Sequence, residues 1–261
     1  MSFEALREEL DRWEALGRRA SLWWRDDDAA ADTPALRRLL TLADTYDVTI
    51  GVAAVPAKLA DDAVPIIASC QRCVVMQHGY AHADHAPPGE KRSELGSHRA
   101  LPVIADELLR GCERLSAAFG PQFAPLLVPP WNRIGSDVVA ALPELGYRGV
   151  STFAPRREAM PVGGLVACNT HVDIIAWREA RAFAGEDEAA ARLAAHLASR
   201  RELRVDPDEP TGLLTHHLDF ATDAWTFVER LLAFTREHRA AQWLTPGTAF
   251  ALAPATSGRS A

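Results

Sequence analysis

Hydrophobic and polar positions along the chain follow two periods in turn. Residues 3–16 ("FEALREELDRWEAL") place apolar side chains at helical spacing and predict a surface helix. Residues 48–55 ("VTIGVAAV") are a continuous apolar, β-branched run, which is typical of a strand covered on both faces in a parallel sheet. The other predicted helices are 33–47, 59–70, 101–120, 136–147, 186–201 and 223–239, and the other predicted strands are 21–25, 72–77, 124–128, 148–153, 211–217 and 241–246. This alternation predicts a parallel α/β fold.

The length favours a barrel over an open sheet. The chain has 261 residues, and α/β barrels commonly run to about 250 residues as one unit. We find no composition break, low-complexity tract or linker, so we expect a single domain over residues 1–261. The predicted fold is a distorted (β/α) barrel of seven or eight strands. Residues 83–98 are polar and contain a proline pair and two glycines, which predicts a long functional loop.

Charge and composition narrow the possible partners. The formal net charge is −7 and the isoelectric point about 5.7, and no basic patch stands out, so we expect neither nucleic acid nor an anionic membrane surface as a partner. The N-terminal segment is charged throughout and lacks the apolar core of a secretory signal, and no run approaches the roughly 20 apolar residues of a membrane span. We therefore expect a cytoplasmic protein.

The four cysteines fit a reducing compartment. Cys70 and Cys73 form a C-x-x-C pair, which is compatible with a redox or zinc site. A structural zinc site of this type needs a second pair, however, and Cys112 and Cys168 are isolated. Cys73 also opens an apolar run, where a small buried residue fits. We therefore expect the pair to be structural.

Unusual polar groups follow four of the predicted strands. Three adjacent aspartates, Asp26 to Asp28, follow the strand "SLWWR". "HGYAH" (78–82), "PPWNR" (129–133) and the pair 216–217 ("HH") each follow or end another strand. In a parallel barrel, functional side chains lie at the carboxyl ends of the strands. The sequence therefore predicts a functional site where these segments meet.

The spacing of His78 and His82 suits a metal ion, because two imidazoles four residues apart can face one cation. The related metalloprotease motif H-E-x-x-H has a catalytic glutamate after the first histidine, and here that position is Gly79. A carboxylate must come from elsewhere, and the aspartate cluster supplies one. A bound divalent ion would also relieve the repulsion among adjacent carboxylates. An Asp/His/His set suits Zn²⁺, and cobalt, nickel or manganese can occupy similar sites.

These motifs resemble the polysaccharide deacetylase superfamily (NodB homology), which includes chitin and peptidoglycan deacetylases. The family order is an Asp-Asp pair, His-x-x-x-His, an Arg-Pro-Pro-aromatic segment, an Asp/Trp segment and a late Leu-x-Leu-His. The corresponding residues, in order over about residues 21–217, are Asp26-Asp27, His78/His82, Pro129-Pro130-Trp131, Asp173/Trp177 and Leu214/His216. The resemblance implies a distorted barrel and a metal-dependent deacetylase acting on a carbohydrate or an acylated small molecule.

The resemblance also implies a role for each matching position. Asp26 would be the general base and His216 the general acid. One divalent metal ion, Zn²⁺ in the first instance, would be held by Asp27, His78 and His82. The remaining positions would contribute to substrate binding, and they are Pro130, Trp131, Asp173, Trp177, Arg25 and His217.

Four departures from the family pattern leave alternatives open. Asp28 stands where the family usually has glycine, so a shift by one residue would make Asp27 the base and Asp28 the ligand. Val128 replaces the arginine that normally orients the base, and Arg25 or Arg133 could substitute for it. Asp173 and Trp177 are not adjacent as in the family. In the last motif, His216 and His217 compete, because neighbours on an extended strand point to opposite sides; the motif spacing favours His216.

Two questions about function stay open at this point. The first is whether the chain is an active deacetylase or a barrel that binds saccharide or metal without turnover, for which the missing arginine is the main support. The second is the role of loop 83–98, whose charged residues could fold over the site and bind substrate or could be solvated; they are Glu90, Lys91, Arg92 and Glu94. We also expect His171 to line the pocket.

Overall fold

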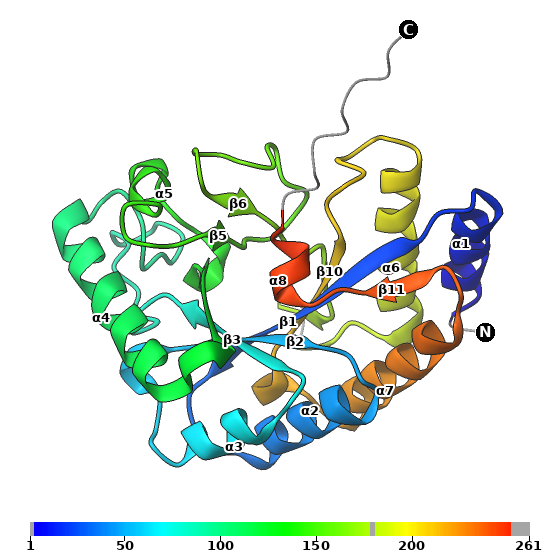
Figure 1. Cartoon of the computed structure of the whole chain (residues 1–261), viewed down its shortest axis with the longest axis horizontal. Coiled ribbons are helices and arrows are strands. Elements are labelled where there is room, and N and C mark those ends of the chain that lie inside the picture. Colours follow the sequence, from blue (N-terminus) through cyan, green and yellow to red (C-terminus); the bar gives the residue numbers. More distant parts are fainter. Residues whose placement is uncertain (1–2, 178–180, 252–261) are drawn as a thin grey trace, which may run out of the picture.

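The computed structural model describes residues 3–177 and 181–251, and these form a curled, mostly parallel sheet with helices around its outside (Figure 1). The strands of the sheet are β1 (Ala20–Ala29), β2 (Ile50–Ala54), β3 (Cys73–His78), β4 (Phe123–Val128), β5 (Gly149–Val150), β6 (Val166–Ala167), β7 (Val172–Asp173), β10 (Thr211–Thr215) and β11 (Ala241–Trp243). Their order is β6-β5-β4-β3-β2-β1-β10-β7, with β11 paired to β1, and these neighbouring strands pair in parallel. The predicted distorted (β/α) barrel is confirmed.

The helices cover the outer face of the sheet, with α2, α3 and α7 below the strands and α4 and α6 on opposite sides in Figure 1. The described helices are α1 (Glu4–Ala15), α2 (Pro34–Thr45), α3 (Ala63–Ser69), α4 (Leu101–Phe119), α5 (Ser136–Ala141), α6 (Glu186–Arg201), α7 (Thr222–Glu237) and α8 (Pro246–Ala249). Thr33 caps α2 as its sequence predicts, because its hydroxyl accepts a hydrogen bond from the Leu36 amide at 3.0 Å. Helix α1 packs on α6, where the buried Glu9 pairs with Arg201 at 2.7 Å.

Trp23 and Trp24 show how β1 divides the core. Trp24 belongs to the large apolar cluster between the sheet and its outer helices. Trp23 belongs to a separate cluster inside the barrel, together with Met76 of β3 and Phe250, which follows α8. Consecutive residues of a strand point to opposite faces, so one strand supplies a large side chain to each layer. Helix α8 and Phe250 thus help to fill the barrel interior below the strand ends.

The structure differs from the predicted elements mainly around residues 142–183. Strand β5 covers two of the six residues predicted at 148–153, and the short strands β6 and β7 have no clear hydrophobic run in the sequence. A further antiparallel hairpin, β8 (Ile175–Ala176) with β9 (Ala182–Phe183), was not predicted. Two-residue strands carry too little periodicity to be recognised. The predicted helix 59–70 is shorter, because it begins at Ala63 after the 3₁₀ turn Pro56–Lys58.

The cysteine pair is structural. Cys70 and Cys73 are buried, and burial raises the pKa of the Cys70 thiol to about 12. Such thiols hold their protons at neutral pH and are poor nucleophiles, which argues against a redox role. Among the described residues, no helix combines the length and apolar character needed to cross a bilayer.

Candidate active site

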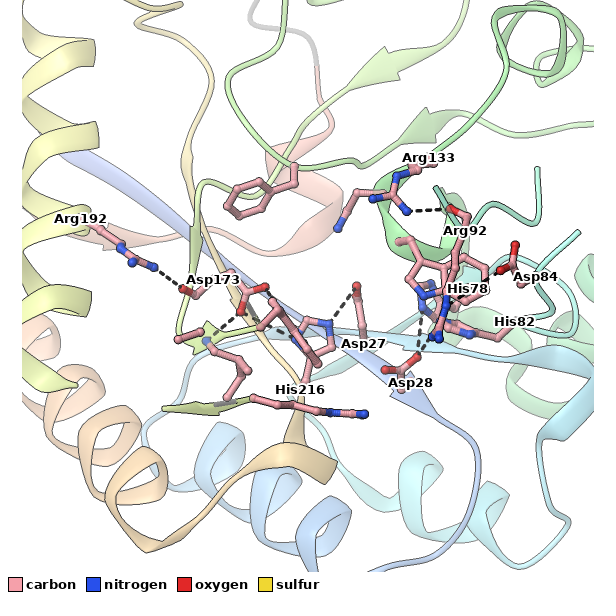
Figure 2. A pocket seen from close by; sticks show the side chains of 17 residues that line it. Asp27, Asp28, His78, His82, Asp84, Arg92, Arg133, Asp173, Arg192 and His216 are labelled. Atoms are coloured by element: carbon pink, nitrogen blue, oxygen red, sulfur yellow. Dashed lines mark hydrogen bonds and ion pairs between the residues drawn. The ribbon is translucent and has the colours of Figure 1, made fainter. Parts of the chain in front are cut away.

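A cavity of about 1020 Å³ lies at the carboxyl ends of the strands (Figure 2). Parallel strands deliver the residues that follow them to one end of the barrel, which is why segments far apart in the sequence meet here. The predicted residues in its wall are Asp27, His78, His82, Trp131, Asp173, Trp177 and His216, and Asp28 joins them. The convergence inferred from the strand ends is therefore present in the structure.

The three aspartates have three different environments, set by the alternation of β1. Arg25 and Asp27 point into the barrel, above Trp23, whereas Asp26 points to the other face of the strand. There Asp26 is fully buried and accepts hydrogen bonds from the Thr215 hydroxyl (2.7 Å) and the His217 amide (3.1 Å). Asp26 is not part of the cavity wall.

Asp28 would share the face of Asp26 in a regular strand, but its backbone departs from that geometry. Its φ is +74°, and the pairing of β1 with β2 shifts register between Asp26 and Ala29. Aspartate tolerates this left-handed region better than most residues. The irregularity brings Asp28 to the cavity beside Asp27, so that two consecutive carboxylates serve one site.

Asp28, His78 and His82 form a compact cluster of possible metal ligands. Asp28 Oδ1 lies 3.3 Å from His78 Nε2 and 3.2 Å from His82 Nε2. His78 Nδ1 donates to the Val128 carbonyl at 3.0 Å, which leaves Nε2 of that ring facing the cluster. One carboxylate oxygen and two imidazole nitrogens with an open side toward the cavity are a suitable donor set for a catalytic divalent ion.

The charges of this cluster perturb one another. Burial alone would raise the pKa of Asp28, but the hydrogen bond and charge of His78 and the charge of His82 hold it well below its usual value. Burial would lower the pKa of His78, and the nearby charges of Asp27 and Asp28 reverse this and raise it. The pKa of His82 is lowered, by burial and then by His78. A carboxylate held ionised beside two imidazoles favours a cation between them.

Asp27 is held by Arg25, its second neighbour on β1. Arg25 Nε lies 2.9 Å from Asp27 Oδ1, and its NH2 nitrogen donates to Asp27 Oδ2 at 3.0 Å. The guanidinium is completely buried and is itself held by Ser151, through the carbonyl (3.1 Å) and the hydroxyl (2.8 Å), and by Asn132 Oδ1 (2.8 Å). Arg25 therefore fixes the orientation of Asp27 from the barrel interior.

His216 lies on the other side of Asp27. Its Nε2 is 3.9 Å from Asp27 Oδ2, and its Nδ1 is 3.9 Å from Asp173 Oδ1. Trp177 packs edge-on against the imidazole at 4.7 Å between ring centroids and donates its indole N–H to Asp173 Oδ2 at 2.6 Å. Asp173 and Trp177 thus form one unit around His216, although four residues separate them in sequence.

His217 takes no part in the cavity wall. It is buried, and its Nδ1 lies 2.5 Å from Asp26 Oδ1. Burial would lower the pKa of His217, but the adjacent Asp26 carboxylate raises it overall. The two histidines of the last motif therefore diverge, His216 to the cavity and His217 to the buried Asp26.

Loop 83–98 supports the site through Glu94. This residue is fully buried, and its carboxylate accepts hydrogen bonds from the amides of Tyr80 (3.2 Å) and Ala81 (2.7 Å) in the "HGYAH" segment. Gly79 has φ +55°, and a Cβ there would lie 1.9 Å from Glu94 Oε2 and 2.7 Å from Pro130. Glycine is therefore required where the H-E-x-x-H motif has glutamate. Glu94 is a structural anchor of the turn that carries His82, and Glu90 and Lys91 are exposed.

Several predicted substrate-binding residues lie behind the wall. Pro130 is buried against Gly79, and Arg25 and His217 are enclosed as described above, so none of the three lines the cavity. Trp131 does line it, at 4.4 Å from the His82 ring. His171 was expected in the pocket and is not in its wall. Its ring stacks on that of His196 at 3.7 Å.

Seven residues of the cavity wall were not identified as site residues from the sequence, and they are Asp84, Asn132, Phe153, Ile175, Ala176, Arg181 and Arg192. Asn132 lies next to the "PPW" motif, so its place was accessible from the sequence. Phe153 and Arg181 come from the short, weakly patterned strands and hairpin that were predicted poorly. Arg192 lies on α6, and its NH1 nitrogen donates to the Asp173 carbonyl at 3.2 Å. No sequence pattern predicts this contact.

Known structures of deacetylases share this architecture. No protein-family model matches the sequence, and no curated protein matches it. A putative polysaccharide deacetylase from Mycobacterium smegmatis superposes with a TM-score of 0.65 at 15% identity, over 89% of each chain. A family 4 acetyl xylan esterase from Clostridium thermocellum, in complex with a cobalt ion, has a TM-score of 0.52 at 13% identity, over 88% of this chain and 90% of that one.

A third neighbour is a mutant of a family 4 pseudoenzyme with restored enzymatic activity, with a TM-score of 0.55 at 13% identity, over 89% of this chain and 68% of that one. The fold is thus shared by active and inactive proteins. The resemblance predicted from the motif order is confirmed at the level of architecture: this chain has the fold of the polysaccharide deacetylase superfamily.

Proposed function

We propose that this protein is a metal-dependent deacetylase that hydrolyses an N-acyl group, an acetyl group in the first instance, on a sugar or a related amide. The observation that carries the proposal is the cluster of Asp28, His78 and His82 at one wall of a cavity that also exposes Asp27 and His216. Metal ligands, a separate carboxylate and a histidine are the groups that this hydrolysis requires.

The metal ligands in this proposal are Asp28, His78 and His82. This corresponds to the alternative in which Asp27 is the base and Asp28 the ligand. Their nitrogen and oxygen donors fit zinc and related divalent ions. Such an ion, when bound, polarises the acyl carbonyl and lowers the pKa of the attacking water. The turn that carries His82 is held by Glu94, so the ligand geometry is preorganised by the protein.

Asp27 acts as the general base in this scheme. Its carboxylate lies at the cavity, and Arg25 holds it by two contacts from behind. Arg25 thereby supplies what the family takes from the arginine at the position of Val128. Asp26 has no access to the cavity, so it serves as the partner of His217. Asp27 would take the proton of the water that attacks the acyl carbon.

His216 acts as the general acid. Its two nitrogens face Asp27 and Asp173, and Trp177 fixes the plane of the ring. A histidine in this position can pass a proton to the departing amine nitrogen. The half-exposed aromatic rings of Trp177 and Phe153 offer flat apolar surfaces for a sugar ring, and Trp131 beside His82 is suited to the acyl group.

The competing function is a barrel that binds saccharide or metal without turnover, as a pseudoenzyme of this fold would. Its main support in the sequence is the loss of the motif arginine at Val128. The buried Arg25–Asp27 pair weakens that support, because the guanidinium of Arg25 contacts the proposed base, Asp27, in place of the missing motif arginine.

The test is acetate release from a panel of N-acetylated substrates, neutral and anionic, by protein loaded with zinc, cobalt or manganese. We expect activity that is lost on chelation and restored by the metal. His78→Ala should lose both metal and activity, and His98→Ala, at an exposed residue outside the cavity, should keep both. If no substrate releases acetate while the protein still binds metal, the binding function is favoured. If His78→Ala keeps its metal and its activity, the proposed site is wrong.

A further inference from the structure

Four arginines line the cavity of a chain whose net charge is −7, and they are Arg92, Arg133, Arg181 and Arg192. Two of them have close acidic partners. Arg181 pairs with Asp219 at 2.9 Å, and Arg192 pairs with Glu188 at 2.8 Å. Their charges are therefore largely neutralised before any ligand binds.

Arg92 and Arg133 differ from that pair. Among the described residues, Arg133 has no ion pair; its NH1 nitrogen donates only to the backbone carbonyl of Arg92, at 2.7 Å. The Arg92 side chain is 71% exposed, and its Nε lies 3.9 Å from Asp84 Oδ2, at the limit of an ion pair. The other oxygen of this carboxylate, Oδ1, accepts hydrogen bonds from the backbone amides of Ala86 (3.0 Å) and Ser93 (3.1 Å). Two nearly unpaired guanidiniums thus stand at one wall.

This wall lies next to the catalytic groups. Figure 2 shows Arg92 and Arg133 on the same side of the cavity as His82, with Asp173 and Arg192 on the opposite side. Two other carboxylates of the cavity wall are engaged elsewhere, Asp27 by Arg25 and Asp28 by the histidines. Two guanidiniums at one wall repel each other, and an anion bound between them relieves this repulsion.

We propose that the substrate is an anionic acylated sugar whose phosphate or carboxylate group is bound by Arg92 and Arg133 while its acyl group lies at Asp27 and His216. The inference rests on the proposed function, because it takes this cavity as the deacetylation site. Guanidinium forks match the oxygens of phosphate and carboxylate by paired hydrogen bonds. A cavity of about 1020 Å³ has room for both ends of such a ligand.

The test uses binding, so that it does not depend on turnover. Calorimetry on the metal-loaded protein compares glucosamine 6-phosphate, glucosamine 1-phosphate and muramic acid, which carries a carboxylate, with neutral glucosamine. We expect at least one anionic sugar to bind about tenfold more tightly than glucosamine, with a ratio that falls as salt is added. The sugar with the largest ratio identifies the anion and its position.

Arg92→Gln is the informative variant, because within the described part of the chain the Arg92 guanidinium has one polar contact, the long one to Asp84. It should reduce the ratio of anionic to neutral affinity about tenfold. Arg204→Gln removes another exposed arginine, which lies outside the cavity and pairs with Glu202, and should leave the ratio unchanged.

Equal affinities for all four sugars would overturn the inference, as would an unchanged ratio in Arg92→Gln, which would place the anion on the metal. Acetate release is measured in parallel on the N-acetylated forms. Selective binding without acetate release contradicts the proposed deacetylase and leaves the anionic ligand standing. Release at equal kcat/KM from neutral and anionic forms, with equal affinities, contradicts only the anionic specificity.

Discussion

Arg25 and Asp27 are second neighbours on β1, and the buried guanidinium of the first contacts the carboxylate of the second through two nitrogen–oxygen pairs, at 2.9 and 3.0 Å. The pair is local in sequence, yet it stands at the centre of the site, because the alternation of the strand points both side chains into the barrel. In the proposed function, an arginine two residues before the base would do the work that the polysaccharide deacetylase pattern assigns to a separate segment.

Replacing Arg25 by lysine tests this positioning. A single ammonium cannot contact Asp27, Ser151 and Asn132 in the same fork, so Asp27 loses its fixed orientation. We expect kcat to fall roughly 10- to 100-fold with metal content unchanged. Arg200→Lys is the matched control, at another fully buried arginine that binds Ser21 outside the cavity. It should cost stability, seen as a lower Tm, and leave kcat in place; an equal loss of kcat in both variants would contradict the assignment.

The aspartate cluster gives a sharper test, because the two possible assignments of base and metal ligand predict opposite results for Asp27 and Asp28. In the structure-based assignment, Asp28→Asn loses the metal, and Asp27→Asn keeps it but loses about 10²- to 10⁴-fold in kcat. Metal content measured by mass spectrometry separates the two variants even before an activity is known. If Asp27→Asn lost the metal and Asp28→Asn kept it, Asp27 would be the ligand and the base would have to be sought again.

His216 and His217 should respond differently to substitution by glutamine. His216→Gln removes the proton donor, so kcat should fall by about 10²- to 10⁴-fold with little change in stability. His217→Gln leaves the buried Asp26 carboxylate without its imidazole partner, which should lower the free energy of unfolding by about 3 kcal/mol. Chemical denaturation and steady-state kinetics on both variants provide the comparison. A kinetic defect confined to His217→Gln would exchange the two roles.

The stacked pair His171 and His196 predicts a loss of stability in acid. Burial, followed by the charges of His171 and Arg200, lowers the pKa of His196 to about 2, and burial also lowers that of His171. In the unfolded chain a histidine titrates near pH 6.5. Below that pH the unfolded chain therefore binds a proton at His196 that the folded chain does not bind. Stability contributed by His196 is therefore present above pH 6.5 and is lost as the pH falls.

His196→Gln makes that contribution measurable. Between pH 7.5 and 5.5 the wild-type protein should lose about 1 kcal/mol more of its unfolding free energy than the variant does. Urea denaturation at the two pH values gives the difference, and His98→Gln, at an exposed residue, is the control. Equal pH dependence in wild type and His196→Gln would show that His196 can be protonated in the folded protein.

The sequence by itself determined the fold and the segments that build the site. Alternating apolar strands and amphipathic helices specify a parallel barrel, and polar residues after such strands must gather at one end of it. The positions of His78, His82 and His216 followed from that rule, since each lies at or just beyond the end of a well-patterned strand. Short elements such as β6, β7 and the β8–β9 hairpin could not be predicted from the sequence, because two residues are too few to show a hydrophobic periodicity.

Only the tertiary structure decided how the individual polar groups divide the work. The three aspartates look equivalent in the sequence, and what separates them is the left-handed backbone of Asp28 and the enclosure of Asp26 with His217. Likewise, Arg25 and Arg133 were equal candidates until the barrel interior placed one beneath Asp27 and the other beside Arg92. Hydrophobic periodicity specifies which face a segment buries, whereas local backbone irregularities and long-range partners decide where a single side chain points.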